Sequence, residues 1–232
     1  MTEHIVKSYE EQLQSLTNTI VKMGGLAESQ FSGSINALLK RDEDLADKIA
    51  GKDLKMNEFD IMIENQVIDL IALRQPMGID LRETVSSMRI SSELERIGDL
   101  SKNIAKRVRH LNFDVPTDIA DSIRRASNVV QKNLKDVLDS YSKRAKDVAF
   151  RVWNSDLEVD SLVNFAMDQL LAFMKTDKKN LEISTHLLFA AKHIERVGDH
   201  VTNISENVYF LVTGDQIKGT RSKGEKPAPT KD

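Results

Sequence analysis

The stretch SSELERIGDLSKNI, residues 91–104, recurs as AKHIERVGDHVTNI, residues 191–204, with six identical positions at an offset of 100 residues. The preceding part of the chain repeats at an offset of 103 residues, so that Lys40-Arg41 recurs as Lys143-Arg144 and Asp53-Leu54 as Asp156-Leu157. The offset changes by three residues across the loop around Pro76. Matches that keep their order over two consecutive segments indicate an internal duplication of about 100 residues.

The composition of the whole chain favours helices. The 232 residues include 10 Gly, 4 Pro, 8 Phe, 3 Tyr and 1 Trp, which is too few turn formers and aromatic residues for a sandwich or barrel. We therefore predict an all-α protein of two similar three-helix bundles, residues 1–113 and 114–214, and a flexible tail over 215–232. The six predicted helices span residues 5–40, 42–74, 80–112, 117–139, 142–175 and 179–213.

Capping residues and helix breakers set the predicted helix ends. Asp42 is a suitable N-cap for the second helix, and Asp80 with Glu83 has the spacing of a capping box for the third. Pro116 suits the first turn of the fourth helix, and Gly214 suits the end of the sixth.

Composition also excludes several classes of protein. The chain has no cysteine, so disulfides and thiolate metal sites are excluded. Its net charge of −3 gives no general attraction to nucleic acid. No apolar run approaches the roughly 18 residues of a membrane span, and the first residues have no signal-peptide core. We therefore expect a cytoplasmic protein that does not bind nucleic acid.

Carboxylates recur one helical turn apart on two neighbouring helices of each repeat. On the third and sixth helices they lie opposite the apolar residues, so we expect them to face out of the bundle. Two carboxylates at this spacing repel each other by about a few tenths of a kcal/mol, and a bridging cation reverses that sign. The predicted metal ligands are Asp53, Glu95, Asp99, Asp156, Asp160, Glu195 and Asp199.

Oxygen ligands of this kind suit iron, zinc, manganese or magnesium. The alternative is a solvated acidic face without metal. Asn57 replaces the second acid of the first repeat, where the second repeat has Asp160, so we expect tighter binding in the second repeat.

Other polar residues of the repeat have less specific interpretations. Arg96 and Arg196 either neutralise acids on a neighbouring helix or bind a partner protein. His186, His193 and His200 recur every seven residues, and we interpret them as boundary residues because the first repeat has no histidine at matching positions.

Gly98 and Gly198 lie in the middle of the predicted third and sixth helices. Glycine there costs up to about 1 kcal/mol, so we expect a close approach between helices at both positions.

The chain lacks the patterns of the common enzyme classes. It has no Gly-rich phosphate loop, no Glu followed by His three residues later, and no recognisable nucleophile with its base. A metal-dependent hydrolase and a metal-storage protein nevertheless remain as alternatives, since both would use the carboxylate pairs.

The residues resemble the PhoU family. The resemblance rests on the paired motifs LERIGD, residues 94–99, and IERVGDH, residues 194–200, and on Arg74-Gln75-Pro76 followed by Asp80-Leu81-Arg82. It covers roughly residues 5–214, and the tail lies outside it.

This resemblance implies an accessory protein of high-affinity phosphate transport and a negative regulator of the phosphate regulon. The implied partners are a PhoR-type sensor histidine kinase and the PstB-type ATPase of the phosphate transporter, with contact to the membrane only through them. We also expect a homodimer. Some family members carry metal clusters on Glu/Asp-x-x-x-Asp motifs, which match the predicted ligands above, except that Asn57 replaces one acid.

Overall fold

The computed structural model describes residues 2–218, and their side chains from Ser8 onward. Within that range the chain is helical and contains no strand, so the all-α prediction is confirmed. The predicted tail, residues 215–232, lies outside the described residues from 219 onward. The elements are α1 (Thr2–Lys40), α2 (Glu43–Gly51), α3 (Asp53–Arg74), α4 (Gly78–Lys106), the 3-10 helix η1 (Val108–His110), α5 (Thr117–Lys143), α6 (Lys146–Asn154), α7 (Asp156–Met174) and α8 (Asn180–Thr213).

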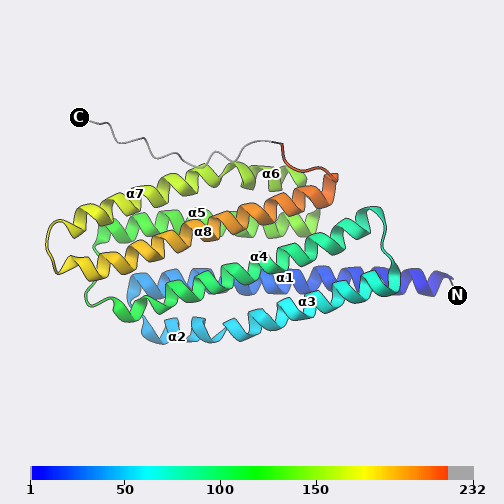
Figure 1. Ribbon diagram of the computed structural model, residues 1–232, viewed down its shortest axis with the longest axis horizontal. Helices are drawn as coiled ribbons and strands as arrows, with labels where there is room; N and C mark the ends of the chain where they lie inside the picture. Colours follow the sequence, from blue (N-terminus) through cyan, green and yellow to red (C-terminus); the bar gives the residue numbers. More distant parts are fainter. Residues whose placement is uncertain (1, 219–232) are drawn as a thin grey trace.

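The helices form two similar bundles that lie side by side along the length of the molecule. Figure 1 shows α1–α4 in one half and α5–α8 in the other, with most helix axes close to the long direction. α4 packs against α8, and α1 packs against α5, so these four helices join the two bundles. α3 and α7 lie at opposite outer edges (Figure 1). The predicted boundary between the bundles, at residues 113 and 114, falls in the connection from η1 to α5.

Apolar residues at helical spacing explain why α4 and α8 hold the centre of the fold. Ile90, Leu94 and Ile97 of α4 are buried, and Ile194 and Val197 repeat the pattern in α8. Residues three and four apart lie on one face of a helix, so each set forms an apolar stripe that packs into the core.

Two of the predicted long helices are each interrupted once. The predicted helix 42–74 is α2 and α3, separated at Lys52, and the predicted helix 142–175 is α6 and α7, separated at Ser155. Lys52 has φ −74° and ψ −11°, and Ser155 has φ −83° and ψ −2°, so both stay near helical geometry. The interruption makes Asp53 and Asp156 the first residues of α3 and α7, where the helix dipole favours a carboxylate.

Several predicted ends shift as well. α4 ends at Lys106 instead of residue 112 because the chain tightens into η1. α5 continues past the predicted end at 139 because Ser140 and Tyr141 are buried, and it ends where Arg144 takes a left-handed φ of 51°. The Gly214 ending is confirmed, with a φ of 80°.

The capping predictions have opposite outcomes. Asp42 is the predicted N-cap and accepts a hydrogen bond from the Leu45 backbone at 2.9 Å. The capping box of Asp80 and Glu83 is wrong, because α4 begins at Gly78 and its N-cap makes no side-chain hydrogen bond. Glu83 is instead buried and pairs with Arg144 from the other bundle at 2.5 Å.

The close approach predicted at the two mid-helix glycines is confirmed. A Cβ atom added to Gly98 would lie 3.1 Å from Met56 Cγ on α3. A Cβ atom added to Gly198 would lie 3.0 Å from Val159 Cγ1 on α7. Glycine at these positions lets α4 and α8 pack tightly against the helices that carry the acids Asp53 and Asp156.

Candidate functional site

The first acid cluster consists of Asp53 on α3 with Glu95 and Asp99 on α4, and Lys102 reaches into it. The Lys102 Nζ atom is 2.5 Å from Asp53 Oδ2 and 3.8 Å from Asp99 Oδ1. The ammonium group therefore bridges α3 and α4 and neutralises part of the negative charge that the cluster brings together.

The electrostatics of the first acid cluster follow from this crowding. Burial raises the pKa of Glu95, and the neighbouring Asp99 carboxylate raises it further. The hydrogen bond to Asp53 raises the pKa of Lys102, with the carboxylates around it adding to the effect and burial opposing it. Lys102 therefore stays protonated at neutral pH, and the cluster keeps its internal cation.

The second acid cluster is the repeat of the first and consists of Asp156 and Asp160 on α7 with Glu195 and Asp199 on α8. Asp156 is 7% exposed, and the Thr202 hydroxyl donates a hydrogen bond to its Oδ1 atom at 3.1 Å. Lys192 lies 2.5 Å from Glu195 on the exposed side of α8.

The acids on α4 and α8 are partly buried, so the expectation that they face out of the bundle holds only in part: the Asp99 side chain is 39% exposed. The side chains of Asp53 and Glu95 are 16% and 22% exposed. The reason is that α4 packs against α1, α3 and α8, and it therefore buries more than one face. Only the side towards solvent remains open, and Arg96 and Arg196 are exposed there.

The predicted partner-binding arginines do not tie the helices together. The Arg96 Nε atom lies 3.6 Å from Oε2 of Glu95, its neighbour in sequence, and the Arg96 side chain is 64% exposed. Arg196 is exposed in the same way on α8. Their binding of a partner protein stays a prediction.

Metal binding by the two acid clusters also stays a prediction. In the part of the chain that the structure describes, no three His, Asp or Glu side chains are arranged to hold a metal ion as they stand. In the first acid cluster, the Lys102 ammonium lies between the two carboxylates that a shared ion would need. That cluster does not fit a metal ion. The second has a Thr202 hydroxyl at the same position, and its donors are all oxygen atoms.

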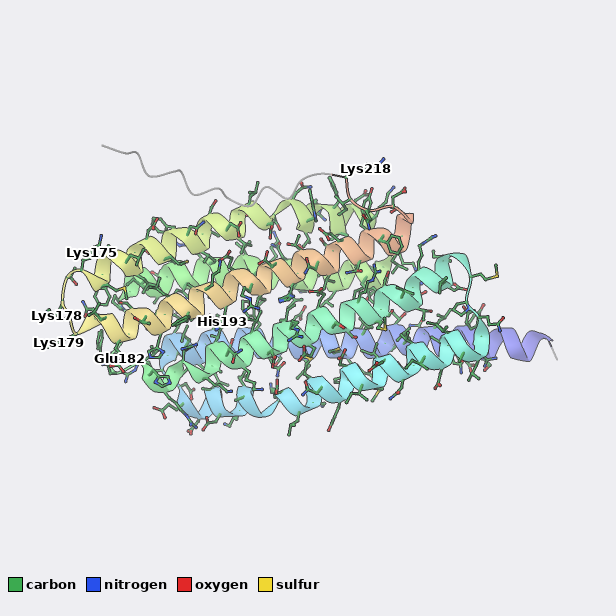
Figure 2. All side chains as sticks on the ribbon, in the orientation of Figure 1. Lys175, Lys178, Lys179, Glu182, His193 and Lys218 are labelled. Carbon is green, nitrogen blue, oxygen red and sulfur yellow. The ribbon has the colours of Figure 1, made fainter. Side chains whose placement is uncertain are left out.

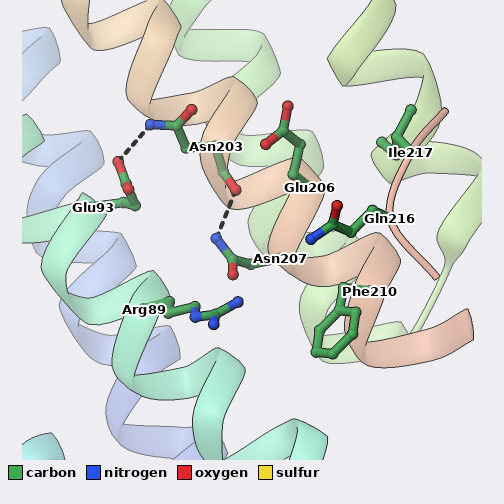
Figure 3. Close-up of a pocket in the computed structure, with 8 residues that line it drawn as sticks. All are labelled: Arg89, Glu93, Asn203, Glu206, Asn207, Phe210, Gln216 and Ile217. Atoms are coloured by element: carbon green, nitrogen blue, oxygen red, sulfur yellow. Dashed lines mark hydrogen bonds between the residues drawn. The ribbon is translucent and has the colours of Figure 1, made fainter. Parts of the chain in front are cut away.

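Sequence patterns missed a polar seam between the bundles. Glu93 on α4 accepts hydrogen bonds from His200 Nδ1 at 2.6 Å and from Asn203 Nδ2 at 3.1 Å, both on α8. A pocket of about 550 Å³ opens beside this contact. Figure 3 shows its lining residues, Arg89, Glu93, Asn203, Glu206, Asn207, Phe210, Gln216 and Ile217.

The histidines of α8 lie along the same seam, as their prediction as boundary residues requires. His186 stacks on His110 of η1, with ring centroids 4.3 Å apart. Burial lowers the pKa of His186, and His110 and Arg107 lower it further. His193 lies between α8 and α4 (Figure 2), and burial followed by Arg107 lowers its pKa as well. A seven-residue spacing of histidines was the available signal for this seam.

Comparisons with known proteins agree with the duplication. The PhoU domain family matches residues 20–108 and again residues 123–208. A phosphate-specific transport system accessory protein PhoU homolog of Caulobacter vibrioides is 44% identical, covering 96% of this chain and 97% of that protein. A homolog of the same description from Rhizobium meliloti is 40% identical, covering 96% of this chain and 94% of that protein.

Two crystal structures share the fold. PhoU from Pseudomonas aeruginosa has a TM-score of 0.85 at 30% identity. The match covers 89% of this chain and 100% of the Pseudomonas chain. The phosphate transport system regulatory protein PhoU from Streptococcus pneumoniae has a TM-score of 0.84 at 27% identity. The match covers 90% of this chain and 99% of the Streptococcus chain. Among residues 2–218, no helix has the length and apolar character needed to cross a membrane.

Proposed function

This chain belongs to the PhoU family, and we propose that it represses the phosphate regulon as an adaptor between the phosphate transporter and a sensor histidine kinase. Its relatives are accessory and regulatory proteins of phosphate transport, so the chain is an accessory protein of that system and not an enzyme. The observation that carries the proposal is the duplicated Glu-Arg-x-Gly-Asp motif on α4 and α8, within a likeness that spans 96% of the chain.

The finer part of the proposal names two partners, a PstB-type transporter ATPase and a PhoR-type kinase. An adaptor needs a contact surface for each. Large apolar side chains are exposed on α3 every seven residues, at Leu54, Ile61 and Ile68. The matching edge of the other bundle exposes Leu157 and Leu171 on α7. Exposed apolar groups of this kind are typical of protein–protein contacts, and Figure 1 places α3 and α7 on opposite edges.

Deletion of the protein tests the regulatory role directly. In cells grown in high phosphate, a reporter of a phosphate-starvation gene should be switched on in the deletion strain and silent after complementation. Unchanged reporter output in the deletion strain would show that the protein does not repress the regulon.

Variants of the two apolar edges test the adaptor mechanism. The double substitution Ile61→Asp and Ile68→Asp should prevent co-purification of one partner, the ATPase or the kinase, and leave the other bound. Glu64→Ala is the matched control because Glu64 is exposed on the same helix but is not apolar. Retention of both partners by the double variant, with an unchanged circular dichroism spectrum, rules out the α3 surface.

Three further predicted properties concern hydrolase activity, metal binding and oligomeric state. The relatives give no support to a metal-dependent hydrolase, since they are named as accessory and regulatory proteins. Binding of iron, zinc, manganese or magnesium is proposed for the second acid cluster alone. A homodimer is proposed from the family resemblance, and sedimentation equilibrium of the purified chain measures it.

A further inference from the structure

The two acid clusters occupy equivalent positions but differ at two of them. Lys102 in the first repeat corresponds to Thr202 in the second, and Asn57 corresponds to Asp160. Both differences make the first acid cluster less negative than the second. The first repeat has gained a cation and lacks one carboxylate, whereas the second has a neutral hydroxyl and keeps that carboxylate.

The position of the Lys102 ammonium group gives this difference a physical meaning. Its Nζ atom lies 2.5 Å from Asp53 on α3 and 3.8 Å from Asp99 on α4. A metal ion shared by the two helices would bridge the same two carboxylates. A divalent cation and the ammonium group repel each other, so both cannot lie between Asp53 and Asp99 at once.

The environment favours the lysine in this competition. Lys102 and Asp53 are 25% and 16% exposed, so their contact is largely protected from solvent. A charge-assisted hydrogen bond in such a place is stronger than a neutral one. Lys102 is also part of α4, so it occupies the cluster at every metal concentration, whereas a free ion must bind from solution.

The equivalent position of the second repeat contains no such cation. The Thr202 hydroxyl has one proton to donate, which it shares between Asp156 Oδ1 and the Gly198 carbonyl oxygen, both at 3.1 Å. Thr202 therefore connects α7 and α8 without adding charge. The second acid cluster has a polar link where the first has an ionic one.

We propose that Lys102 is the built-in cation of the first acid cluster, holding Asp53 and Asp99 together in place of a metal ion. The first bundle then keeps its α3–α4 contact without metal. The first acid cluster then contributes no metal response of its own. This inference rests on the contacts of Lys102 and is independent of the proposed regulatory function.

Calorimetric titration of the metal-stripped full chain with Mn²⁺ tests the proposal. Replacing Lys102 by Thr, the residue of the second repeat, should add about one Mn²⁺ per chain to the number that the wild type binds. The melting temperature of Lys102→Thr should be lower than that of the wild type without metal, and Mn²⁺ should recover part of the loss. The double variant Lys102→Thr with Asp53→Asn should lose the added Mn²⁺ again.

A second measurement does not depend on the folding of a Lys102 variant. Asp99→Asn in the otherwise unchanged chain should bind as much Mn²⁺ as the wild type, because the first acid cluster binds none. A Lys102→Thr variant that gains no Mn²⁺ overturns the proposal. So does an Asp99→Asn variant that loses one.

Discussion

Glu83 is a buried carboxylate that connects three helices. It is 4% exposed, accepts a hydrogen bond from Thr17 of α1 at 3.0 Å and pairs with Arg144, after α5, at 2.5 Å. The two members of the ion pair differ in exposure, because the Arg144 side chain is 41% exposed. Loss of the arginine leaves a buried charge without its cation, whereas loss of the glutamate leaves a guanidinium that water can solvate.

Substitutions of this pair should therefore have unequal effects. Arg144→Gln should lower the free energy of unfolding by about 2–3 kcal/mol, less than for a fully buried pair because Arg144 is partly exposed. Glu83→Gln keeps hydrogen-bonding capacity and should cost about 1 kcal/mol. Urea denaturation of both variants measures the difference. Equal losses would mean that burial of Glu83 is not the dominant effect.

His186 should make the stability of the protein depend on pH. Its pKa lies below the ordinary histidine value of 6.5 because of burial, His110 and Arg107, with Glu182 opposing. As the pH falls, His186 of the unfolded chain therefore takes up its proton at a higher pH than His186 of the folded chain. The stabilisation due to neutral His186 is complete above pH 6.5 and is lost as the pH falls from 6.5 towards the lower pKa of the folded state.

Replacing His186 by Gln should remove part of that pH dependence. Unfolding free energies measured by urea between about pH 7.5 and 5 should fall less steeply for His186→Gln than for the wild type. Parallel curves for the two proteins would show that His186 does not contribute.

Residue-level predictions from sequence succeeded where the partner is local. Asp42 caps a backbone group three residues away, and Gly214 supplies its own backbone conformation. The capping box at Asp80 and Glu83 failed because both side chains bond to distant residues. Arg144 is 61 residues from Glu83, and no local spacing reports such a contact.

At the scale of elements, the periodicity of apolar residues gave the helices but not all their faces or ends. α4 packs against α1, α2, α3 and α8, so a division into one apolar and one solvent face placed Glu95 and Asp99 too far outside. Gly51 directly precedes the interruption at Lys52, but the repeat has Asn154 before Ser155, so the shared break has no common signal in the sequence. Both interruptions nevertheless put Asp53 and Asp156 at helix starts, which is where each acid cluster begins.

The two mid-helix glycines should respond differently to alanine. Alanine improves helix propensity by about 0.5–1 kcal/mol, and overpacking costs about 1–3 kcal/mol. At Gly98 the new methyl group meets Met56 and the side-chain oxygen of Gln30, each at 3.1 Å, and both are long unbranched side chains, so we expect a loss of about 1 kcal/mol. At Gly198 it meets Val159, whose β-branched side chain is stiff, so we expect a loss of about 1–2 kcal/mol.

Gly25→Ala is the matched control, because a Cβ atom there has nothing within 4 Å. That substitution should raise the free energy of unfolding by up to about 1 kcal/mol through helix propensity alone. Thermal unfolding of the three variants provides the comparison. A Gly198→Ala protein as stable as Gly25→Ala would show that α8 and α7 can move apart at no cost.

At the scale of the whole molecule, the duplication predicted two bundles but not how they join. The seam between α4 and α8 depends on side chains that differ between the repeats. Glu93 contacts His200 and Asn203, yet the position equivalent to Glu93 is His193 and the position equivalent to His200 is Leu100. A repeat reveals what its copies share, whereas an interface between the copies also uses what they do not share.

The two acid clusters should also differ in their response to metal. Mn²⁺ titration followed by thermal unfolding measures this difference. The second acid cluster has four carboxylates on two adjacent helices, with Thr202 at the position of Lys102, and its cation Lys192 contacts Glu195 from the exposed side. Binding requires these side chains to turn towards a common point. An ion at 100 times its dissociation constant then stabilises the folded state by about 2.7 kcal/mol. For a protein of this size, that raises the melting temperature by about 5–10 °C.

Asp199→Asn should remove most of this increase because it neutralises one of the carboxylates of the second acid cluster. Asp99→Asn is the matched substitution in the other repeat, and it should leave the increase intact because the first acid cluster already contains the Lys102 ammonium. If neither substitution changes the affinity for Mn²⁺ or the metal-dependent shift in melting temperature, the carboxylates of the second acid cluster bind no metal, and their remaining role is a polar face of the bundle or a surface for a partner protein.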